Sequence, residues 1–118
     1  MDILGRRNHL SLQDNPDSHI DYVTSLSGEV NLAAVDKPLL LQLRYVPDRV
    51  ILEPASFIAY LAHLSVQDWD SLERLATTIL DDMNNELVAR WVQVTIDSGS
   101  ATDGAPRHHR VFLQDSQP

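Results

Sequence analysis

The chain has 118 residues, 43% of them hydrophobic and 22% charged, which is enough for one globular domain with its own core. It contains no cysteine, which excludes disulfide bonds, thiolate metal ligands and a cysteine nucleophile. The net charge of −8 argues against nucleic acid and anionic membrane surfaces as partners, since both require a basic face. No apolar run approaches the length of a membrane span, and residues 1–14 lack the apolar centre of a signal peptide, so we expect a cytoplasmic protein.

The first part of the chain predicts an arm followed by two strands. Residues 1–18 are polar, and we expect an N-terminal arm or loop there. Residues 21–35 mix apolar side chains with Ser and Thr, which predicts a strand, and Gly28 is the candidate for a bulge. After a turn at residues 36–38, the apolar and then alternating run 39–46 predicts a second strand. Neighbouring strands joined by a short turn favour an antiparallel hairpin.

The middle of the chain predicts two helices. Pro54 suits a first helical turn, and residues 55–64 carry apolar side chains at helical spacing. Residues 68–87 are the clearest element, because their apolar side chains form one stripe with a period near 3.6. We expect Asp68 or Asp70 to cap the start of this second helix.

Two further strands complete the order β-β-α-α-β-β. Residues 91–96 alternate, a connection rich in small and polar residues covers 97–106, and residues 108–113 predict the last strand. This order is typical of an α+β fold in which two helices cover one face of a four-stranded antiparallel sheet. We expect a single domain over residues 19–114 and a frayed C-terminus at 115–118. Such a sheet leaves two open edges and an uncovered face, which favours a homo-oligomer.

Four motifs, in this order and spacing, resemble a known superfamily. They are Arg44-Tyr45-Val46-Pro47-Asp48, Glu53 with Ser56, Tyr60 and Leu61, Ile79-Leu80-Asp81-Asp82, and Ala89-Arg90-Trp91-Val92-Gln93-Val94. The chain thereby resembles the tunnelling fold, or T-fold, and residues 21–94 are most similar to the 7-cyano-7-deazaguanine (nitrile) reductases of the queuosine pathway (QueF-like). The resemblance implies a ring of subunits that binds a planar, nitrogen-rich ring, such as a purine or pterin, between subunits.

The sequence departs from the nitrile reductases at their catalytic residues. Those enzymes use a cysteine thiolate and bind NADPH through two lysines, whereas this chain has no cysteine and carries Ala55 and Ile58 at the lysine positions. We therefore expect an enzyme that acts on such a ring by acid–base chemistry without a cofactor. Two alternatives stay open, namely an NADPH-dependent 7-cyano-7-deazaguanine reductase and a non-catalytic ligand-binding or scaffold protein.

The resemblance also implies the residues of the site. In T-fold proteins an interface glutamate accepts hydrogen bonds from the N–H edge of the ring, and Glu73 stands at that position. Glu53 is expected to face the same pocket or to accept a bond near a helix start. For Glu73 the alternative is an exposed helix residue beside Arg74. His63 and His19 are candidates for proton transfer, because imidazole titrates near neutral pH, or are surface histidines.

No metal site is expected. Two histidines four residues apart on a helix could share a metal ion, but no pair has this spacing among His9, His19, His63, His108 and His109. The adjacent carboxylates Asp81 and Asp82 would point about 100° apart on a helix. We expect this pair to lie on a solvated face.

Overall fold

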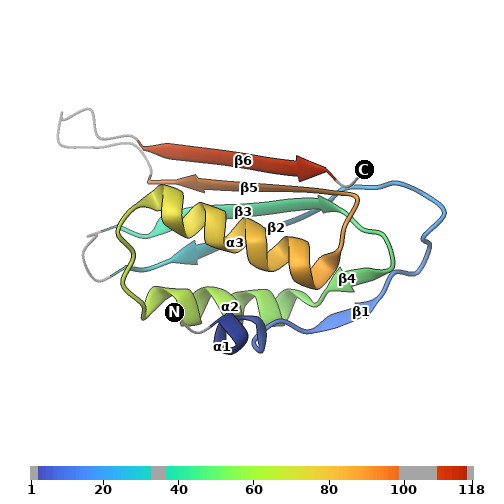
Figure 1. Ribbon diagram of the computed structural model, residues 1–118, viewed down its shortest axis with the longest axis horizontal. Helices are drawn as coiled ribbons and strands as arrows, with labels where there is room; N and C mark the ends of the chain where they lie inside the picture. Colours follow the sequence, from blue (N-terminus) through green and yellow to red (C-terminus); the bar gives the residue numbers. More distant parts are fainter. Residues whose placement is uncertain (1–2, 33–36, 99–108, 117–118) are drawn as a thin grey trace.

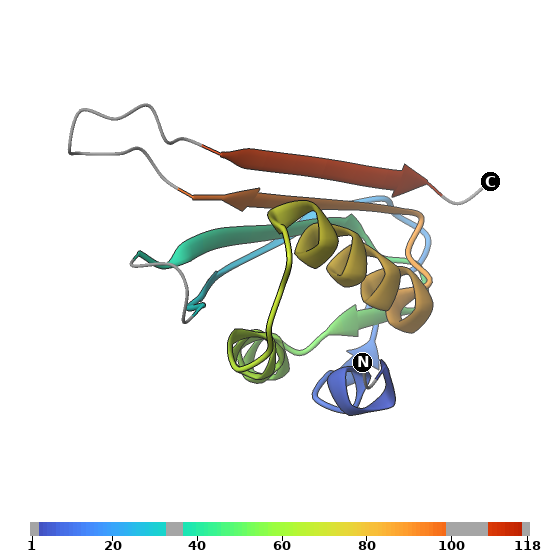
Figure 2. The ribbon, with the colours of Figure 1, turned by 60° about the vertical axis from the view of Figure 1, so that its left-hand side comes forward.

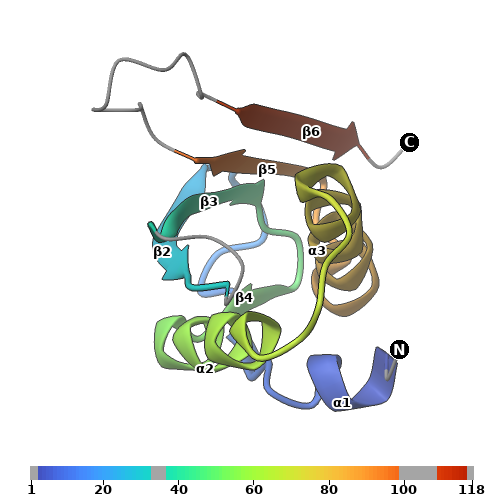
Figure 3. The same cartoon turned by 90° about the vertical axis from the view of Figure 1, so that its left-hand side faces the viewer.

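The computed structural model describes residues 3–32, 37–98 and 109–116. Its centre is a four-stranded antiparallel sheet in the order β2-β3-β5-β6, and two helices cover one face of it (Figure 1). The strands are β2 (Thr24–Val30), β3 (Leu39–Val46), β5 (Trp91–Asp97) and β6 (Arg110–Ser116), and the helices are α2 (Pro54–Ser65) and α3 (Leu72–Leu87). Seen along the strands, both helices lie on the same side of the sheet (Figure 3). The expected α+β order and layering are therefore confirmed.

The β3 strand has the predicted bounds, because its side chains alternate as a half-covered strand requires. Leu39, Leu41, Leu43 and Tyr45 are buried under the helices, whereas Leu40 and Gln42 are exposed on the other face. The neighbouring β5 contributes Val92, Val94 and Ile96 to the same core. The sheet thus presents one apolar face to α2 and α3 and leaves the other face open.

The β2 strand is shorter than predicted and has no bulge at Gly28. This glycine pairs in regular register with Leu41. A Cβ atom at Gly28 would lie 2.4 Å from Cδ1 of Leu61, a buried side chain of α2. The glycine therefore allows α2 to approach β2 closely. Its role at this position is to make room for a helix, and it forms neither a turn nor a bulge.

The helix α2 begins at Pro54 as expected, but α3 begins four residues later than the predicted start at 68. Its N-cap is Ser71, whose side chain accepts a hydrogen bond from the Arg74 backbone N–H at 3.0 Å, so neither Asp68 nor Asp70 caps it. The connection before Ser71 holds Trp69, which is half-buried and donates its indole N–H to the Leu64 carbonyl. Of the expected turn at 36–38, residue 36 lies outside the described residues, and of the expected connection at 97–106, residues 99–106 do.

The expected N-terminal arm is instead folded against the domain. It forms α1 (Ile3–Arg7) and β1 (Leu12–Asp14), and β1 pairs antiparallel with β4 (Val50–Leu52). Figure 2 shows this N-terminal unit on the helical side of the sheet. The domain therefore begins well before residue 19, and β6 extends to Ser116, so an ordered strand covers half of the C-terminal segment expected to fray. No helix in the described part of the chain is long and apolar enough to cross a bilayer.

The prediction that Asp81 and Asp82 share a solvated face is wrong for Asp82, which is fully buried. The Asp82 carboxylate accepts two hydrogen bonds from the Arg6 guanidinium at 2.9 and 3.0 Å and one from Arg7 at 2.9 Å. It also accepts one from the Tyr60 hydroxyl at 2.5 Å. These bonds explain why the N-terminal segment is ordered: its two arginines neutralise a carboxylate that α3 buries.

The electrostatics of this cluster, which we call the Asp82 clamp (Arg6, Arg7, Tyr60 and Asp82), keep the carboxylate ionised. Burial alone would raise the pKa of Asp82, but the hydrogen bonds from Arg6, Tyr60 and Arg7 outweigh it and hold the pKa below its ordinary value. Burial and the neighbouring carboxylate raise the pKa of Tyr60, which stays a donor. The clamp is therefore an ion pair with a phenol donor, and it joins α1, α2 and α3.

Candidate functional site

The site implied for Glu73 lies at the start of α3. Glu73 is in the first helical turn, after the Ser71 cap, and its side chain is 61% exposed. The pKa of its carboxyl is lowered, first by a hydrogen bond from its own backbone N–H and then by one from His109. The first turn of a helix also favours negative charge. Glu73 therefore presents an ionised, accessible acceptor, as binding to the N–H edge of a ring requires.

The neighbour of Glu73 is His109, a residue that the sequence did not single out for catalysis or ligand binding. The His109 ring Nε2 lies 3.0 Å from Glu73 Oε2. Two hydrogen bonds hold the backbone of His109: its N–H donates to Ser98 Oγ at 2.8 Å, and the Ser98 N–H donates to the His109 carbonyl at 2.9 Å. A carboxylate that orients an imidazole is a common acid–base arrangement. We call this pair the Glu73–His109 dyad.

The dyad lies at an edge of the sheet. His109 directly precedes β6, which pairs with β5 and is the last strand of the sheet order. The helix α3 packs over β5 and β6, so Glu73 reaches the edge from the helical layer. Among the described residues, no further strand pairs with β6 on its outer side. A second molecule could therefore complete the site from that side.

Glu53 does not share a pocket with Glu73 within one chain. It is the N-cap residue of α2, its carboxylate makes no capping hydrogen bond, and its backbone N–H donates to the Ser11 carbonyl. The helices α2 and α3 begin at opposite ends of the molecule, as Figure 1 shows. The two glutamates therefore lie far apart within one subunit, and a shared pocket between subunits stays a prediction.

The two histidines expected to transfer protons, His63 and His19, do not contact the Glu73–His109 dyad. His63 is half-buried in the last turn of α2, where its Nε2 lies 2.8 Å from Gln67 Nε2 and its ring packs on that of His9. His19 is exposed and follows an Asx turn, in which its backbone N–H donates to the Asp17 side chain. Neither is bonded to Glu73 in the described residues, so His109 is the histidine that the fold brings to this carboxylate.

A hollow of about 430 Å³ lies on the open face of the sheet, away from the helices. Its lining side chains come from all four strands and include Ser27, Glu29, Leu40, Gln42, Thr95 and Arg110. Because these residues alternate with the buried ones, the hollow and the dyad lie on opposite faces of the sheet. Among the residues that the structure describes, no three His, Asp or Glu side chains are grouped as metal ligands.

Comparison with solved structures supports the fold. The chain is similar to a protein from Vibrio cholerae described as a "putative dihydroneopterin aldolase (FolB)", with a TM-score of 0.53 and 12% sequence identity. The match covers 92% of this chain and 97% of that chain. Dihydroneopterin aldolase is a T-fold protein, so the expected T-fold is confirmed. No protein-family model matches the sequence, and neither does any curated protein, so the resemblance to the nitrile reductases stays a prediction.

Proposed function

We propose that this chain is a T-fold subunit that assembles with copies of itself and binds a planar, nitrogen-rich ring of the purine or pterin class at the subunit boundary. The observation that carries the proposal is the Glu73 carboxylate, which is ionised and accessible beside an open sheet edge. A carboxylate accepts two parallel N–H donors, the pattern on the edge of such rings. The T-fold relationship, stated above for the fold alone, points to the same ligand class.

His109 is the proton carrier in this proposal. Its imidazole is held by Glu73 and is half exposed, so a ring bound at Glu73 would lie within its reach. A histidine positioned by a carboxylate can take a proton from one ring atom and return it to another. The proposed activity is therefore acid–base chemistry that uses no cofactor, and His109 takes the role first expected of His63 or His19.

The open edges favour assembly through β2 and β6. Strand directions alternate across the sheet, so β6 of one subunit would run antiparallel to β2 of the next, like every pair within the sheet. Each contact joins two different edges, and repetition of such a contact closes a ring or extends a filament. A ring removes every open edge, which is the usual solution for sheets of this kind.

The register of this junction follows from two rows of directly paired residues that cross the whole sheet. The rows are Glu29–Leu40–Asp97–Arg110 and Leu26–Leu43–Val94–Leu113. Continued into the next subunit, they place Arg110 opposite Glu29 of the partner subunit and Leu113 opposite Leu26 of the partner subunit. A slip of two residues in either direction separates the opposite charges and sets Leu113 against a threonine or a glycine. Charge and apolar matching therefore favour the continued register.

This register also completes the candidate site. The helix α2 packs on β2, and α3 packs on β5 and β6, so α2 of the next subunit would flank α3 across the junction. The backbone of Asn31, just after β2, is bonded to the Ser65 side chain at the end of α2. In the continued register, the row next to that of Arg110 places His109 opposite Val30 of the partner subunit, the last residue of β2. The segment of the partner subunit where β2 meets the end of α2 would therefore face the dyad and enclose the bound ring.

The test is a calorimetric titration with pterin, neopterin, guanine and xanthine. We expect at least one of these compounds to bind the wild-type protein. Glu73→Gln replaces one acceptor oxygen with a donor that faces another donor, and we expect binding about ten- to a hundredfold weaker. Glu86→Gln, in the last turn of the same helix, is the matched control and should bind as wild type does. Equal affinities in all three proteins would return Glu73 to the role of a surface residue.

A further inference from the structure

Ser98 and His109 face each other one row beyond the last pair of β5 and β6. That last pair is Asp97 with Arg110, so the next residues of the two segments, Ser98 and His109, are opposite each other. In the hydrogen-bonded type of antiparallel pair, each residue donates its N–H to the carbonyl of the other. Here the Ser98 N–H donates to the His109 carbonyl at 2.9 Å, but the His109 N–H donates to Ser98 Oγ at 2.8 Å. The Ser98 side chain therefore takes the place of a backbone acceptor and holds His109.

The His109 side chain points toward the helical layer. Side chains alternate between the two faces along a strand, and Val111, two residues after His109, is buried under the helices. The imidazole of His109 therefore lies on the helical face, where Glu73 in the first turn of α3 meets it at 3.0 Å. Because the His109 backbone is bonded through both its N–H and its carbonyl, only χ1 and χ2 remain to bring the imidazole to the carboxylate. The bond to Ser98 thus fixes the backbone from which this contact is made.

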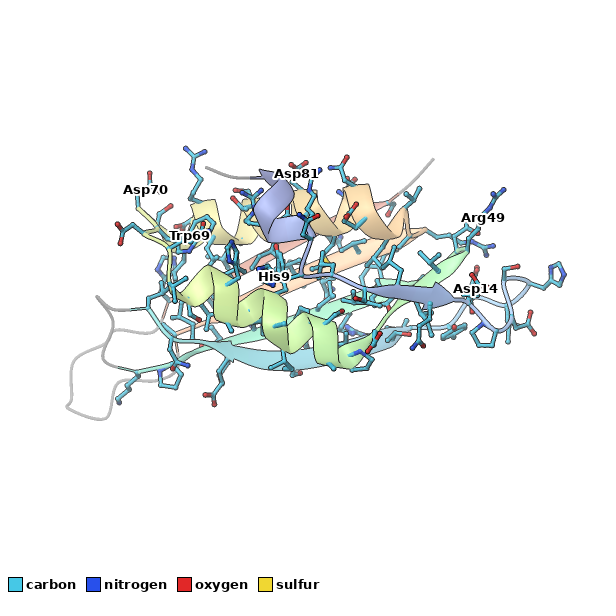
Figure 4. All side chains as sticks on the ribbon, turned by 90° about the horizontal axis from the view of Figure 1, so that it is seen from below. His9, Asp14, Arg49, Trp69, Asp70 and Asp81 are labelled. Carbon is cyan, nitrogen blue, oxygen red and sulfur yellow. The ribbon has the colours of Figure 1, made fainter. Side chains whose placement is uncertain are left out.

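The contact with His109 also favours the ionised form of Glu73. The pKa of the Glu73 carboxyl is lowered first by the bond from its own backbone N–H and second by the bond from His109. The neighbouring Arg74 has Asp70 as its partner at 3.9 Å, and Asp70 lies just before α3 (Figure 4). On the strand side, Arg110 lines the hollow on the opposite face of the sheet. Of the titratable side chains that the structure describes, His109 is thus the one bonded to the Glu73 carboxylate.

The ionised carboxylate decides which nitrogen of His109 carries a proton. A carboxylate only accepts hydrogen bonds, so Nε2, the nitrogen that meets Glu73, must donate. In the neutral ring, Nδ1 is then the basic atom. We propose that Ser98 is a positioning residue, whose hydroxyl oxygen holds His109 so that Nε2 donates to Glu73 and Nδ1 can take a proton from a bound ring. This inference rests on the proposed function, in which His109 is the proton carrier.

The experiment is an NMR titration of the Glu73 side-chain carboxyl in the full-length chain, with no ring compound added. His109→Ala sets the reference, because it removes the imidazole bond and should raise the pKa of Glu73 toward its ordinary value. Ser98→Ala and Ser98→Val both remove the acceptor of the His109 N–H. In each we expect a pKa of Glu73 closer to the His109→Ala value than to the wild-type value. Ser98→Thr has the shape of Ser98→Val but keeps a hydroxyl acceptor, so it should keep the wild-type value.

Ser116→Ala is the matched control, because Ser116 is the exposed last residue of β6, at the opposite end of the strand from His109. It should leave the pKa of Glu73 unchanged. A wild-type pKa of Glu73 in Ser98→Ala would overturn the proposal, and so would an equal rise in Ser98→Thr and Ser98→Val. The titration needs no ring, so it decides the role of Ser98 separately from the calorimetric test of the proposed function. If no compound binds the wild-type protein, the proposed function fails even where Ser98 positions His109.

Discussion

Asp81 and Asp82 are adjacent in sequence, yet their side chains are 66% and 0% exposed. The difference arises because successive residues of a helix point in different directions, and Asp82 points under α1. A buried carboxylate is tolerated only when it is paired, and Arg6, Arg7 and Tyr60 supply the partners. At this scale, a single residue explains why the N-terminal segment is part of the domain.

We predict that Asp82→Asn lowers the free energy of unfolding by about 3–5 kcal/mol, because it leaves the Arg6 guanidinium buried without a counter-charge. Asp81→Asn, one residue away and exposed, should change it by less than about 0.5 kcal/mol. Urea unfolding of the three proteins at pH 7 measures both effects. A similar loss in the two variants would show that burial of Asp82 does not matter for stability.

The Asp82 clamp also makes the free energy of unfolding depend on pH in the acidic range. The folded-state pKa of Asp82 is lowered, so its stabilisation is fully present above the ordinary carboxyl range and disappears as the pH falls through the folded value. The difference between the wild type and Asp82→Asn should therefore be largest at neutral pH and shrink below about pH 4. Urea unfolding of both proteins repeated at pH 7, 4 and 2.5 follows this trend.

Val88 ends α3 in the left-handed region, with φ 46° and ψ 45°, although it is β-branched. This conformation costs an L-residue with a Cβ roughly 1–2 kcal/mol. Replacement by glycine removes this cost, but the greater conformational entropy of glycine in the unfolded chain offsets about half of the gain in stability. We predict that Val88→Gly raises the free energy of unfolding by about 0.5–1 kcal/mol. The side chain is 58% exposed, so little packing is lost.

Val66 is the matched control for Val88. It is also the C-cap residue of a helix and is 82% exposed, but its φ is −94°. Val66→Gly should therefore destabilise the protein slightly, because glycine gains nothing at a negative φ. Thermal unfolding of both variants tests this pair of predictions. A midpoint temperature that shifted in the same direction in both variants would argue against strain at Val88.

At the scale of elements, the contact of α2 with β2 depends on one missing side chain. Gly28 lies under Leu61, and the strand opposite it is regular. Close packing of a helix on a sheet without large voids leaves no room for an added methyl group unless a buried leucine moves. The glycine is thus a requirement of the packing between layers.

We predict that Gly28→Ala lowers the free energy of unfolding by about 1–3 kcal/mol, since the added Cβ would lie 2.4 Å from Leu61 Cδ1. Ser27→Ala, the neighbouring position on the open face, should change it by less than about 0.5 kcal/mol. Chemical denaturation of both variants tests the prediction. A neutral or stabilising Gly28→Ala would mean that α2 can shift outward at little cost.

At the scale of the whole molecule, the sheet has unequal edges that match each other. The β2 edge carries Glu29 and Leu26, and the β6 edge carries Arg110 and Leu113 in the same rows. Both leucines are half-buried in one chain and would lose most of their remaining exposure in a junction. In the proposed junction, the two edges of one chain are therefore complementary to each other.

We predict a homo-oligomer at micromolar concentration that Arg110→Glu weakens, because it sets like charges against each other at every junction. The concentration at which the assembly dissociates should rise about tenfold. The double variant Arg110→Glu with Glu29→Arg restores opposite charges and should recover the wild-type behaviour. Light scattering over a dilution series measures each protein.

Arg49→Glu is the control for this series, since Arg49 is exposed but precedes β4 and lies on neither edge of the large sheet. It should dissociate at the wild-type concentration. A wild-type protein with the mass of one chain would reject the edge junction, and a double variant no better than Arg110→Glu would reject its register.

The sequence by itself determined the class of fold. The period of two over residues 39–46 and the period near 3.6 along the second helix fix which side chains face a core, and both patterns are local. From them follow the order of the elements, the layering of helices on one sheet face and the bounds of β3. The motifs predicted the T-fold, and the resemblance that they carry identified Glu73 as a candidate ligand-binding residue.

The tertiary structure decided the features that depend on residues far apart in the chain. Asp82 meets Arg6 across 76 positions, and Glu73 meets His109 across 36. No local pattern reports such a meeting, so the burial of Asp82, the docking of the N-terminal segment and the identity of the dyad could not be predicted. The start of α3 was misplaced for a similar reason, because Trp69 continues the apolar stripe while the Ser71 cap sets the boundary. Periodicity records which face of an element is apolar, whereas pairing depends on how the folded chain brings those faces together.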